Sequence, residues 1–363
     1  MPQFRCLATR FRHRTVAMIL AVATAGVMVT GCAAGDEPGA VSLGTPLPTE
    51  IPPGTTLVVA DQQERFQTAL RASGELEKLP FKVEFANFIG GPEILEAFRA
   101  GAADVAPVGD VPPIHALAAK QDVPIVAAYQ TDPDGIQLAV APGVTATSVA
   151  DLRGKKIAYA EGTAQQAAVL RALDLAGLTT SDVELVRLQL SDFNDAVRTG
   201  QVDIAPLNEP RLTRFLRTPG ATVIPAEKTQ GIYFGLGYLY ARREATAEPA
   251  KAAALRALVG AFVRSFHWTN THRDEWARTY YIENQKISAE DAGRIVDSLG
   301  EFTFPHLNQQ LVDQQQATID VIDAAGELPR DIDAADGFDL RFDEVITQAV
   351  TAAGARFEQQ EKR

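Results

Sequence analysis

The stretch G-G-P-E-I-L-E-A-F-R-A-G-A-A-D-V-A-P-V-G-D-V-P-P-I, residues 90–114, carries the strongest indication of the fold. Residues 92–99 predict a helix with proline at an early position, where the missing N–H costs nothing. Residues 104–108 predict a short apolar strand, and residues 112–120 predict another helix. This succession is typical of an α/β protein with a mostly parallel sheet covered by helices on both faces.

The same alternation extends outward in both directions. Strands are predicted at 57–60, 81–85, 124–129, 136–140, 156–160, 183–188, 202–206 and 221–225, and helices at 66–77, 164–176 and 192–199. A second αβ unit begins at about 136, because the strand there restarts the pattern. Beyond 245 the chain becomes almost wholly helical, which suggests that it returns to pack on the first unit.

The first 32 residues have the layout of a bacterial export signal. Four arginines precede a small, apolar run from Thr15 to Thr30, which ends in Val29-Thr30-Gly31-Cys32. The run is too short for a comfortable membrane span. The order resembles a lipobox, which implies cleavage before Cys32 and acylation of that residue; an ordinary signal peptide or an uncleaved anchor is the alternative. Residues 33–56 are rich in proline and glycine and predict a flexible linker.

Charge and cysteine content exclude several functions. Removing four arginines from the 34 basic residues leaves 30 against 46 acidic ones, a net of −16. Such a chain is a poor partner for nucleic acid. The two cysteines are Cys6 and Cys32, so the mature domain has no thiol for a disulfide, a metal or catalysis. The histidines lack metal-ligand spacing, and no cofactor motif is present.

Several stretches taken together resemble a known family. They are residues 90–114, 151–164 (D-L-R-G-K-K-I-A-Y-A-E-G-T-A), 170–178 (L-R-A-L-D-L-A-G-L), 195–205 (D-A-V-R-T-G-Q-V-D-I-A) and 266–277 (F-H-W-T-N-T-H-R-D-E-W-A). The chain is similar over 57–330 to the periplasmic binding proteins of ABC importers for sulfonates, taurine, nitrate and thiamine precursors. These proteins have the type II periplasmic-binding-protein fold.

The resemblance implies two αβ lobes with a ligand cleft between them. The first lobe would hold 57–135 and 235–363, and the second 136–234. We therefore expect a monomeric, lipid-anchored binding protein on the extracytoplasmic face of the cell membrane. It would capture a small organic anion or zwitterion and deliver it to an ABC permease with its ATPase. No cofactor is implied, and the expected protein is not an enzyme.

Junctions between strands and helices supply the candidate ligand contacts. Helix starts expose free N–H groups that attract anions, and glycine lets a ligand approach the backbone. On this basis we expect contacts from Gly90, Gly91, Pro92, Asp110, Val111, Gly162 and Thr163. A plain turn is the alternative for the glycines, and an N-cap of the following helix is the alternative for Asp110.

Loops of both units add further candidates. Gln62 and Arg65 follow the first strand, and Arg65 is the only cation near a predicted cleft loop; a solvated helix residue is the alternative. Asn208 and Glu209 follow a strand of the second unit, where Glu209 could bind a ligand ammonium or fix the crossover. Tyr233 would form an aromatic wall or pack in the core.

Three functions remain open at this point. The first is import of an aliphatic sulfonate or sulfate ester, with taurine, nitrate and thiamine-pyrimidine precursors as the other ligands. The second is an enzyme on the same architecture, since thiamine-pyrimidine synthases share it; their cysteine-containing site speaks against this option. The third is a ligand-sensing lipoprotein without transport.

Overall fold

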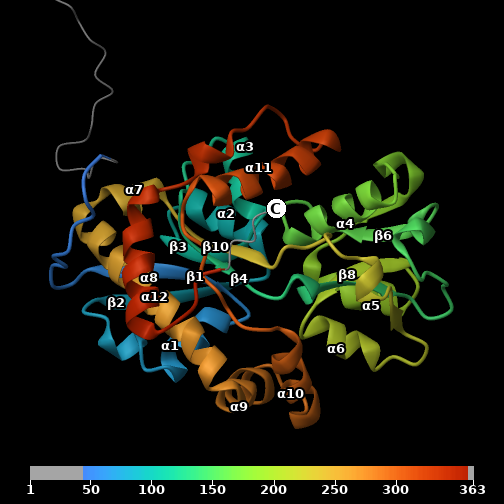
Figure 1. Cartoon of the computed structure of the whole chain (residues 1–363), viewed down its shortest axis with the longest axis horizontal. Coiled ribbons are helices and arrows are strands. Elements are labelled where there is room, and N and C mark those ends of the chain that lie inside the picture. Colours follow the sequence, from blue (N-terminus) through green and yellow to red (C-terminus); the bar gives the residue numbers. More distant parts are fainter. Residues whose placement is uncertain (1–43, 359–363) are drawn as a thin grey trace, which may run out of the picture. The chain divides into compact units, whose positions relative to one another are not determined.

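A computed structural model describes residues 44–358 (Figure 1). The predicted signal peptide, the lipidation site Cys32 and linker residues 33–43 lie outside this range. Two five-stranded sheets form the framework of the described part, and helices accompany both of them. The fold is therefore mixed α/β, which confirms the predicted class.

The first sheet has the strand order β2-β1-β3-β10-β4. Its strands are β1 (Thr56–Gln62), β2 (Lys82–Phe88), β3 (Val105–Gly109), β4 (Ile125–Gln130) and β10 (Leu236–Ala241). β1 pairs in parallel with β2 and β3, whereas β10 runs antiparallel to β3 and β4. The chain thus returns from the second sheet to complete the first.

The second sheet repeats this arrangement with the order β7-β6-β8-β5-β9. Its strands are β5 (Ile136–Val140), β6 (Lys156–Tyr159), β7 (Glu184–Arg187), β8 (Ile204–Asn208) and β9 (Thr222–Val223). β6 pairs in parallel with β7 and β8, and β5 runs antiparallel to β8 and β9. We infer that each sheet with its helices forms one lobe, the first containing β1–β4 and β10 and the second β5–β9.

The α-helices of the described part are α1 (Arg65–Ala72), α2 (Gly91–Arg99), α3 (Pro112–Ala118), α4 (Ala164–Leu175), α5 (Phe193–Arg198), α6 (Arg211–Leu216), α7 (Arg243–Ala247), α8 (Pro249–Thr271), α9 (Arg273–Trp276), α10 (Ala289–Ser298), α11 (Gln309–Ala324) and α12 (Asp343–Ala353). A π-helical segment, η7 (Ala277–Asn284), joins α9 to α10. Short 3-10 turns are η1 (Leu76–Lys78), η2 (Pro133–Gly135), η3 (Val149–Leu152), η4 (Thr180–Asp182), η5 (Leu190–Asp192), η6 (Ala226–Lys228), η8 (Ala334–Gly337) and η9 (Leu340–Phe342).

The predicted strands and helices are confirmed within a few residues, with two exceptions. The helix predicted at 66–77 ends at Ala72, because Gly74 has φ of 67° and breaks it before η1. The aromatic, glycine-rich stretch after 231 contains β10, which was not predicted. A Cβ on Gly237 would lie 2.3 Å from Cζ of Tyr129, so glycine lets β10 pack closely here.

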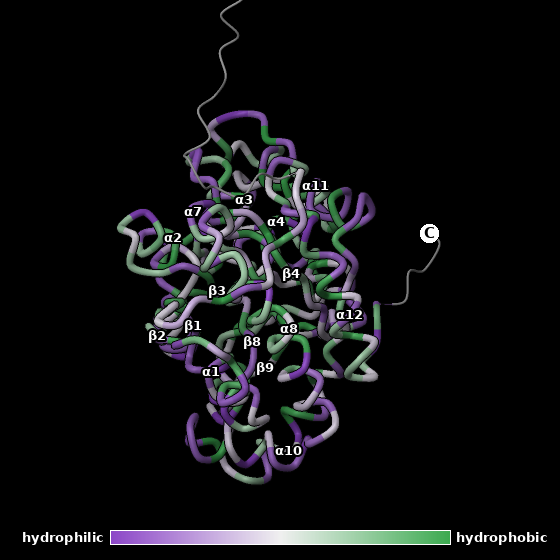
Figure 2. Tube along the Cα trace, turned by 90° about the vertical axis from the view of Figure 1, so that its left-hand side faces the viewer, coloured by the Kyte–Doolittle hydropathy of each residue, from purple (hydrophilic) through white to green (hydrophobic). Residues whose placement is uncertain are grey.

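Apolar side chains fill the space between the sheets and their helices. Hydrophobic stretches run through the interior strands, while hydrophilic stretches occupy many outer loops (Figure 2). One aromatic cluster joins Phe66 of α1, Phe262 and Phe266 of α8, Tyr129 of β4 and Phe302, with ring centroids 4.5 to 5.9 Å apart. The cluster buries the N-terminal turn of α1 and so holds the loop after β1 in place.

No helix among residues 44–358 is long and apolar enough to cross a membrane. Within the same range, no group of three or more His, Cys, Asp and Glu side chains could hold a metal ion.

Candidate ligand-binding site

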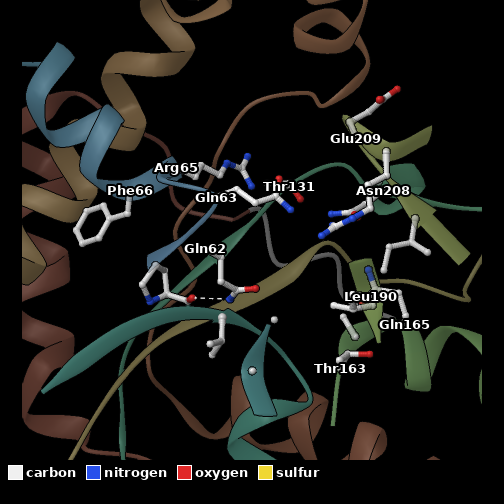
Figure 3. A pocket seen from close by; sticks show the side chains of 18 of the residues that line it. Gln62, Gln63, Arg65, Phe66, Thr131, Thr163, Gln165, Leu190, Asn208 and Glu209 are labelled. Atoms are coloured by element: carbon white, nitrogen blue, oxygen red, sulfur yellow. Dashed lines mark hydrogen bonds between the residues drawn. The ribbon is translucent and has the colours of Figure 1, made fainter. Parts of the chain in front are cut away.

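A cavity of about 170 Å³ is lined by loops from both sheets. Figure 3 shows Gln62, Gln63 and Arg65 on one side, and Thr163, Gln165 and Asn208 on the other. The first group follows β1, whereas the second lies at the start of α4 and the end of β8. The cavity is thus an interlobe site, because each side belongs to a different sheet.

The loop after β1 is held by Asp61, which is fully buried. Its carboxylate accepts backbone N–H groups of Gln62, Phe66 and Gln67 at 2.7 to 3.2 Å. Burial raises the pKa of Asp61 to about 6, and the three N–H groups act against this rise. The Gln62 side chain donates from Nε2 to the carbonyl oxygen of Pro107 at 3.0 Å, which fixes it along the cavity floor.

The start of α4 faces the cavity with free backbone donors. Thr163 is the N-cap residue, but its hydroxyl donates to the carbonyl oxygen of Ala160 at 2.6 Å and does not cap the helix. The N–H groups of Ala164 and Gln165 have no acceptor among the described residues, and both residues line the cavity. A helix of 12 residues with an uncapped start attracts an anion.

Three helix starts meet at this point. A Cβ on Gly91, at the start of α2, would lie 2.4 Å from Cγ of Pro112 in α3 and 3.3 Å from the carbonyl oxygen of Gly162 before α4. Gly91 therefore has to be glycine for the three junctions to approach one another. Pro92 in α2 and the two prolines that begin α3 carry no N–H group, so these two helix starts offer fewer donors than an ordinary helix start.

Arg65 lines the cavity without any partner for its charge. Its guanidinium makes no hydrogen bond or ion pair within residues 44–358, and its Nε atom is buried and unsatisfied. Cζ lies 5.0 Å from the ring centroid of Phe302 and 6.0 Å from that of Phe266. An arginine stays protonated, so an unpaired guanidinium at a cavity wall is a site for an anionic group.

A second arginine, Arg211 at the start of α6, lines the same cavity. Nη1 donates to Oδ1 of Asn208 at 3.4 Å, and no carboxylate of the described chain forms an ion pair with it. With the Gln63 amide oriented to satisfy both groups, its oxygen accepts from Nη1 and Nη2 at 3.0 and 2.9 Å. The prediction that Arg65 is the only cation near the cleft is therefore wrong.

Four tyrosines surround the Arg65 side of the cavity, namely Tyr129, Tyr233, Tyr280 and Tyr281. Burial raises the pKa of each hydroxyl, to about 12 for Tyr281, so all four are neutral. The hydroxyls of Tyr280 and Tyr281 make no hydrogen bond with other described residues. Neutral phenols next to a guanidinium can donate hydrogen bonds to the same anionic group.

The Glu209 and Glu161 side chains both have arginine partners. Glu209 projects away from the other labelled side chains (Figure 3), accepts the Thr213 N–H at 3.1 Å and lies 3.7 Å from Arg294. Glu161 is exposed and paired with Arg187. The cavity is consequently richer in unpaired positive than in unpaired negative charge.

Seven of the predicted site residues line the cavity: Gln62, Arg65, Gly91, Thr163, Asn208, Glu209 and Tyr233. Ligand contact by these residues stays a prediction. The other five, Gly90, Pro92, Asp110, Val111 and Gly162, are not among the lining residues. Gly90 and Val111 are the N-cap residues of α2 and α3, and Pro92 packs against the Gly162 turn.

The side chain of Asp110 does not lie where the sequence predicted. It neither caps α3 nor faces the cavity, because its side chain is buried and paired with Arg171 of α4 at 3.4 Å. Arg171 also donates from Nη2 to Oγ1 of Thr318 at 2.6 Å and lies 4.2 Å over the ring of Phe234. Asp110 thus binds one lobe to the other, in place of contacting a ligand.

Sequence reasoning missed Arg211, Gln165, Tyr280 and Tyr281. Arg211 directly follows the predicted Asn208-Glu209-Pro210 turn, so extending that loop by one residue would have found it. The two tyrosines offered no such signal, since they lie in a helical segment about 70 residues beyond.

Comparison with known proteins agrees with this geometry. The family described as NMT1/THI5-like matches residues 87–269, which is half of the chain. The chain belongs to the NMT1/THI5-like family. It is 27% identical over 252 residues, covering 69% of the chain and 77% of the relative, to an Escherichia coli (strain K12) protein whose name describes it as binding aliphatic sulfonates.

Two solved structures of sulfonate-binding proteins have a similar fold. The alkanesulfonate-binding protein SsuA from Xanthomonas axonopodis pv. citri, bound to MOPS, aligns with a TM-score of 0.72 at 23% identity, over 80% of this chain and 99% of SsuA. The periplasmic aliphatic sulphonate binding protein SsuA from Escherichia coli aligns with a TM-score of 0.68 at 24% identity, over 78% of this chain and 91% of that protein. The predicted periplasmic-binding-protein fold is confirmed, and the relatives support a substrate-binding role in place of a catalytic one.

Proposed function

We propose that the protein is the substrate-binding component of an ABC importer and that it captures an aliphatic sulfonate or a sulfate ester between its lobes. The observation that carries this proposal is that the free N–H groups at the start of α4 and the side chain of Arg211 line the same cavity. No acidic side chain among the described residues forms an ion pair with Arg211. The start of α4 and Arg211 both belong to the second lobe, and a sulfonate has three oxygens that such donors can bind at once.

The walls of the cavity support a ligand with an alkyl part. Ile89, Ile136, Leu190 and Phe266 line it beside the polar groups. An alkyl chain would bury against these side chains, with a gain of about 25 cal/mol per Å² of apolar surface. Nitrate has no such part, which favours a sulfonate over nitrate as the ligand. A thiamine-pyrimidine precursor is the other alternative, and the unpaired arginines favour an anion over it.

Attachment to the membrane follows from the sequence. The proposal places the protein on the extracytoplasmic face, held through acylated Cys32, with the residues between Cys32 and the folded domain as spacer. Acyl chains on one cysteine give stable attachment without a spanning helix. A Cys32→Ala variant that no longer sediments with membranes would support this part, and an unchanged membrane fraction would refute it.

Ligand binding is tested by calorimetric titration of residues 33–363 with propane-1-sulfonate, propyl sulfate, taurine, nitrate and the pyrimidine of thiamine. We expect the sulfonate and the sulfate ester to bind. We expect Arg211→Met to weaken them at least tenfold, since a charged hydrogen bond contributes about 1.5–3 kcal/mol. Arg198→Met is the matched control, because Arg198 is exposed in α5 of the same lobe and pairs with Asp195.

The outcomes separate the alternatives. Binding of nitrate or the pyrimidine with no sulfonate binding would refute the ligand class. Equal affinity in Arg211→Met and wild type would refute the assigned position of the anion. If the protein binds the ligand but a strain that carries the ABC permease encoded next to it does not take the ligand up, the ligand-sensing alternative is favoured.

A further inference from the structure

The cavity contains more positive charge than a single sulfonate requires. On the second lobe, the start of α4 and Arg211 make up the proposed site for the sulfonate. Arg211 donates to Asn208, and Figure 3 places Asn208 on the same side as Thr163 and Gln165. Arg65 lies on the opposite lobe, on the same side of the cavity as Gln62 and Gln63 (Figure 3). A monoanion bound at α4 would leave the Arg65 guanidinium without a counter-charge.

Arg65 is built to receive an anionic group of its own. All of its guanidinium N–H groups lack an acceptor among residues 44–358, and Nε is shut off from solvent. Tyr280 and Tyr281 add two hydroxyls without a partner in the described chain. The ring centroids of Phe266 and Phe302 lie 6.0 and 5.0 Å from the Cζ atom of Arg65. Native proteins seldom leave such a group unsatisfied, and a ligand group is the natural acceptor.

The carboxylates near the cavity form no ion pair with Arg65, although the Arg65 charge lowers the pKa of Asp61. Both oxygens of Asp61 are taken by N–H groups at the start of α1, and neither forms an ion pair with Arg65. Glu209 is turned toward Arg294 and the Thr213 N–H. No other acidic residue lines the cavity. Arg65 is half-buried at the cavity wall and no acidic side chain among residues 44–358 forms an ion pair with it, so a second negative charge on the ligand would be favoured there.

We propose that the preferred substrates are sulfonates with a second acidic group, such as ω-carboxyalkanesulfonates, and that Arg65 selects them. The sulfonate binds the start of α4 and Arg211, and the carboxylate binds Arg65 with the hydroxyls of Tyr280 and Tyr281. This inference rests on the proposed function and deepens it. It also predicts that taurine binds poorly, because its ammonium group would face Arg65.

The test compares three ligands with the same spacer: 3-sulfopropanoate, propane-1-sulfonate and taurine. We expect the Kd of 3-sulfopropanoate to be at least tenfold below that of propane-1-sulfonate, which is about 1.4 kcal/mol, and taurine to bind most weakly. Arg65→Met should reduce the ratio of the two Kd values to below about threefold. Arg211→Met should weaken both ligands by a similar factor and keep the ratio.

Controls separate charge from shape and folding. Arg65→Lys keeps the positive charge and should restore a preference for 3-sulfopropanoate. Arg71→Met, at the last turn of the same helix and exposed, should leave the ratio unchanged. Equal affinity of wild type for 3-sulfopropanoate and propane-1-sulfonate, or an unchanged ratio in Arg65→Met, overturns the inference while sulfonate binding stands. If no sulfonate binds wild type, the proposed function itself fails.

Discussion

Replacing Arg171 with methionine should destabilise the protein by removing one half of a buried, interlobe ion pair. Arg171 is 5% exposed and Asp110 is 1% exposed. Arg171 reaches Thr318 and the carbonyl oxygen of Ile232 as well, so it holds α4 against the first lobe. Methionine keeps much of the stem but leaves Asp110 as an isolated buried acid whose Oδ1 atom already lacks a partner.

The expected loss follows from the burial of the pair. Breaking a buried ion pair by removing one partner costs about 3–5 kcal/mol. For a protein of this size, 1 kcal/mol corresponds to about 2 °C in Tm, so we expect a decrease of about 6–10 °C. Ligand affinity should fall too, because the start of α4 forms part of the proposed anion site and loses its attachment to the first lobe.

The loss should depend on pH with a defined sign. Burial raises the pKa of Asp110, and the Arg171 charge acts against that rise. Removing Arg171 therefore raises the pKa further. A carboxyl whose pKa is higher in the folded than in the unfolded state stabilises the fold at low pH. This stabilisation is lost as the pH rises from the unfolded-state pKa to the folded-state pKa. The deficit of Arg171→Met should accordingly be smaller at about pH 4 than at about pH 7.

Calorimetric unfolding of wild type, Arg171→Met and the double variant Asp110→Asn/Arg171→Met tests this reasoning. The double variant removes both charges and should recover at least half of the lost Tm. If the double variant is as unstable as the single one, or if the deficit of Arg171→Met is independent of pH, then an uncompensated Asp110 is not the cause of the loss.

Two further predictions concern packing and titration in the cavity walls. Gly91→Ala should destabilise the fold by about 1–3 kcal/mol, because its Cβ would lie 2.4 Å from Cγ of Pro112. The control Gly293→Ala in α10 meets nothing within 4 Å and should stabilise the fold by about 0.5–1 kcal/mol. Equal unfolding temperatures of the two variants would contradict the close approach of the helix starts. Asp61, with its pKa raised to about 6 by burial, should make the fold less stable as pH rises from about 4 to 6, and Asp61→Asn should flatten that slope in urea unfolding; an unchanged slope would show that another group titrates.

Much of the fold could be predicted from local patterns. The αβ alternation in 57–225 predicted nine strands and most helices, because each short apolar run between helical segments can only be a buried strand. β10 was missed, since its glycines and tyrosines match no local pattern. Those glycines are explained by Tyr129 and Thr131 of the neighbouring segment, which lie within 2.4 Å of a Cβ on Gly237 or Gly235.

The candidate site also contains residues that local patterns predicted and residues that only the fold brings together. Residues at strand-to-helix junctions, such as Gly91 and Thr163, could be predicted because helix starts expose N–H groups wherever they occur. Arg65, Tyr280 and Tyr281 come together only because η7 packs beside the loop after β1, more than 200 residues earlier in the chain.

The sequence by itself determined most of the elements, the acidic charge, the absence of cysteine beyond residue 32 and the helix starts that attract an anion. The tertiary structure decided which charges remain free. Asp110 and Arg171 pair in the interior, Glu161 pairs with Arg187, Glu209 pairs with Arg294, and no carboxylate among residues 44–358 forms an ion pair with Arg65 or Arg211. Pairing depends on distances between residues far apart in the chain, and such distances exist only after folding.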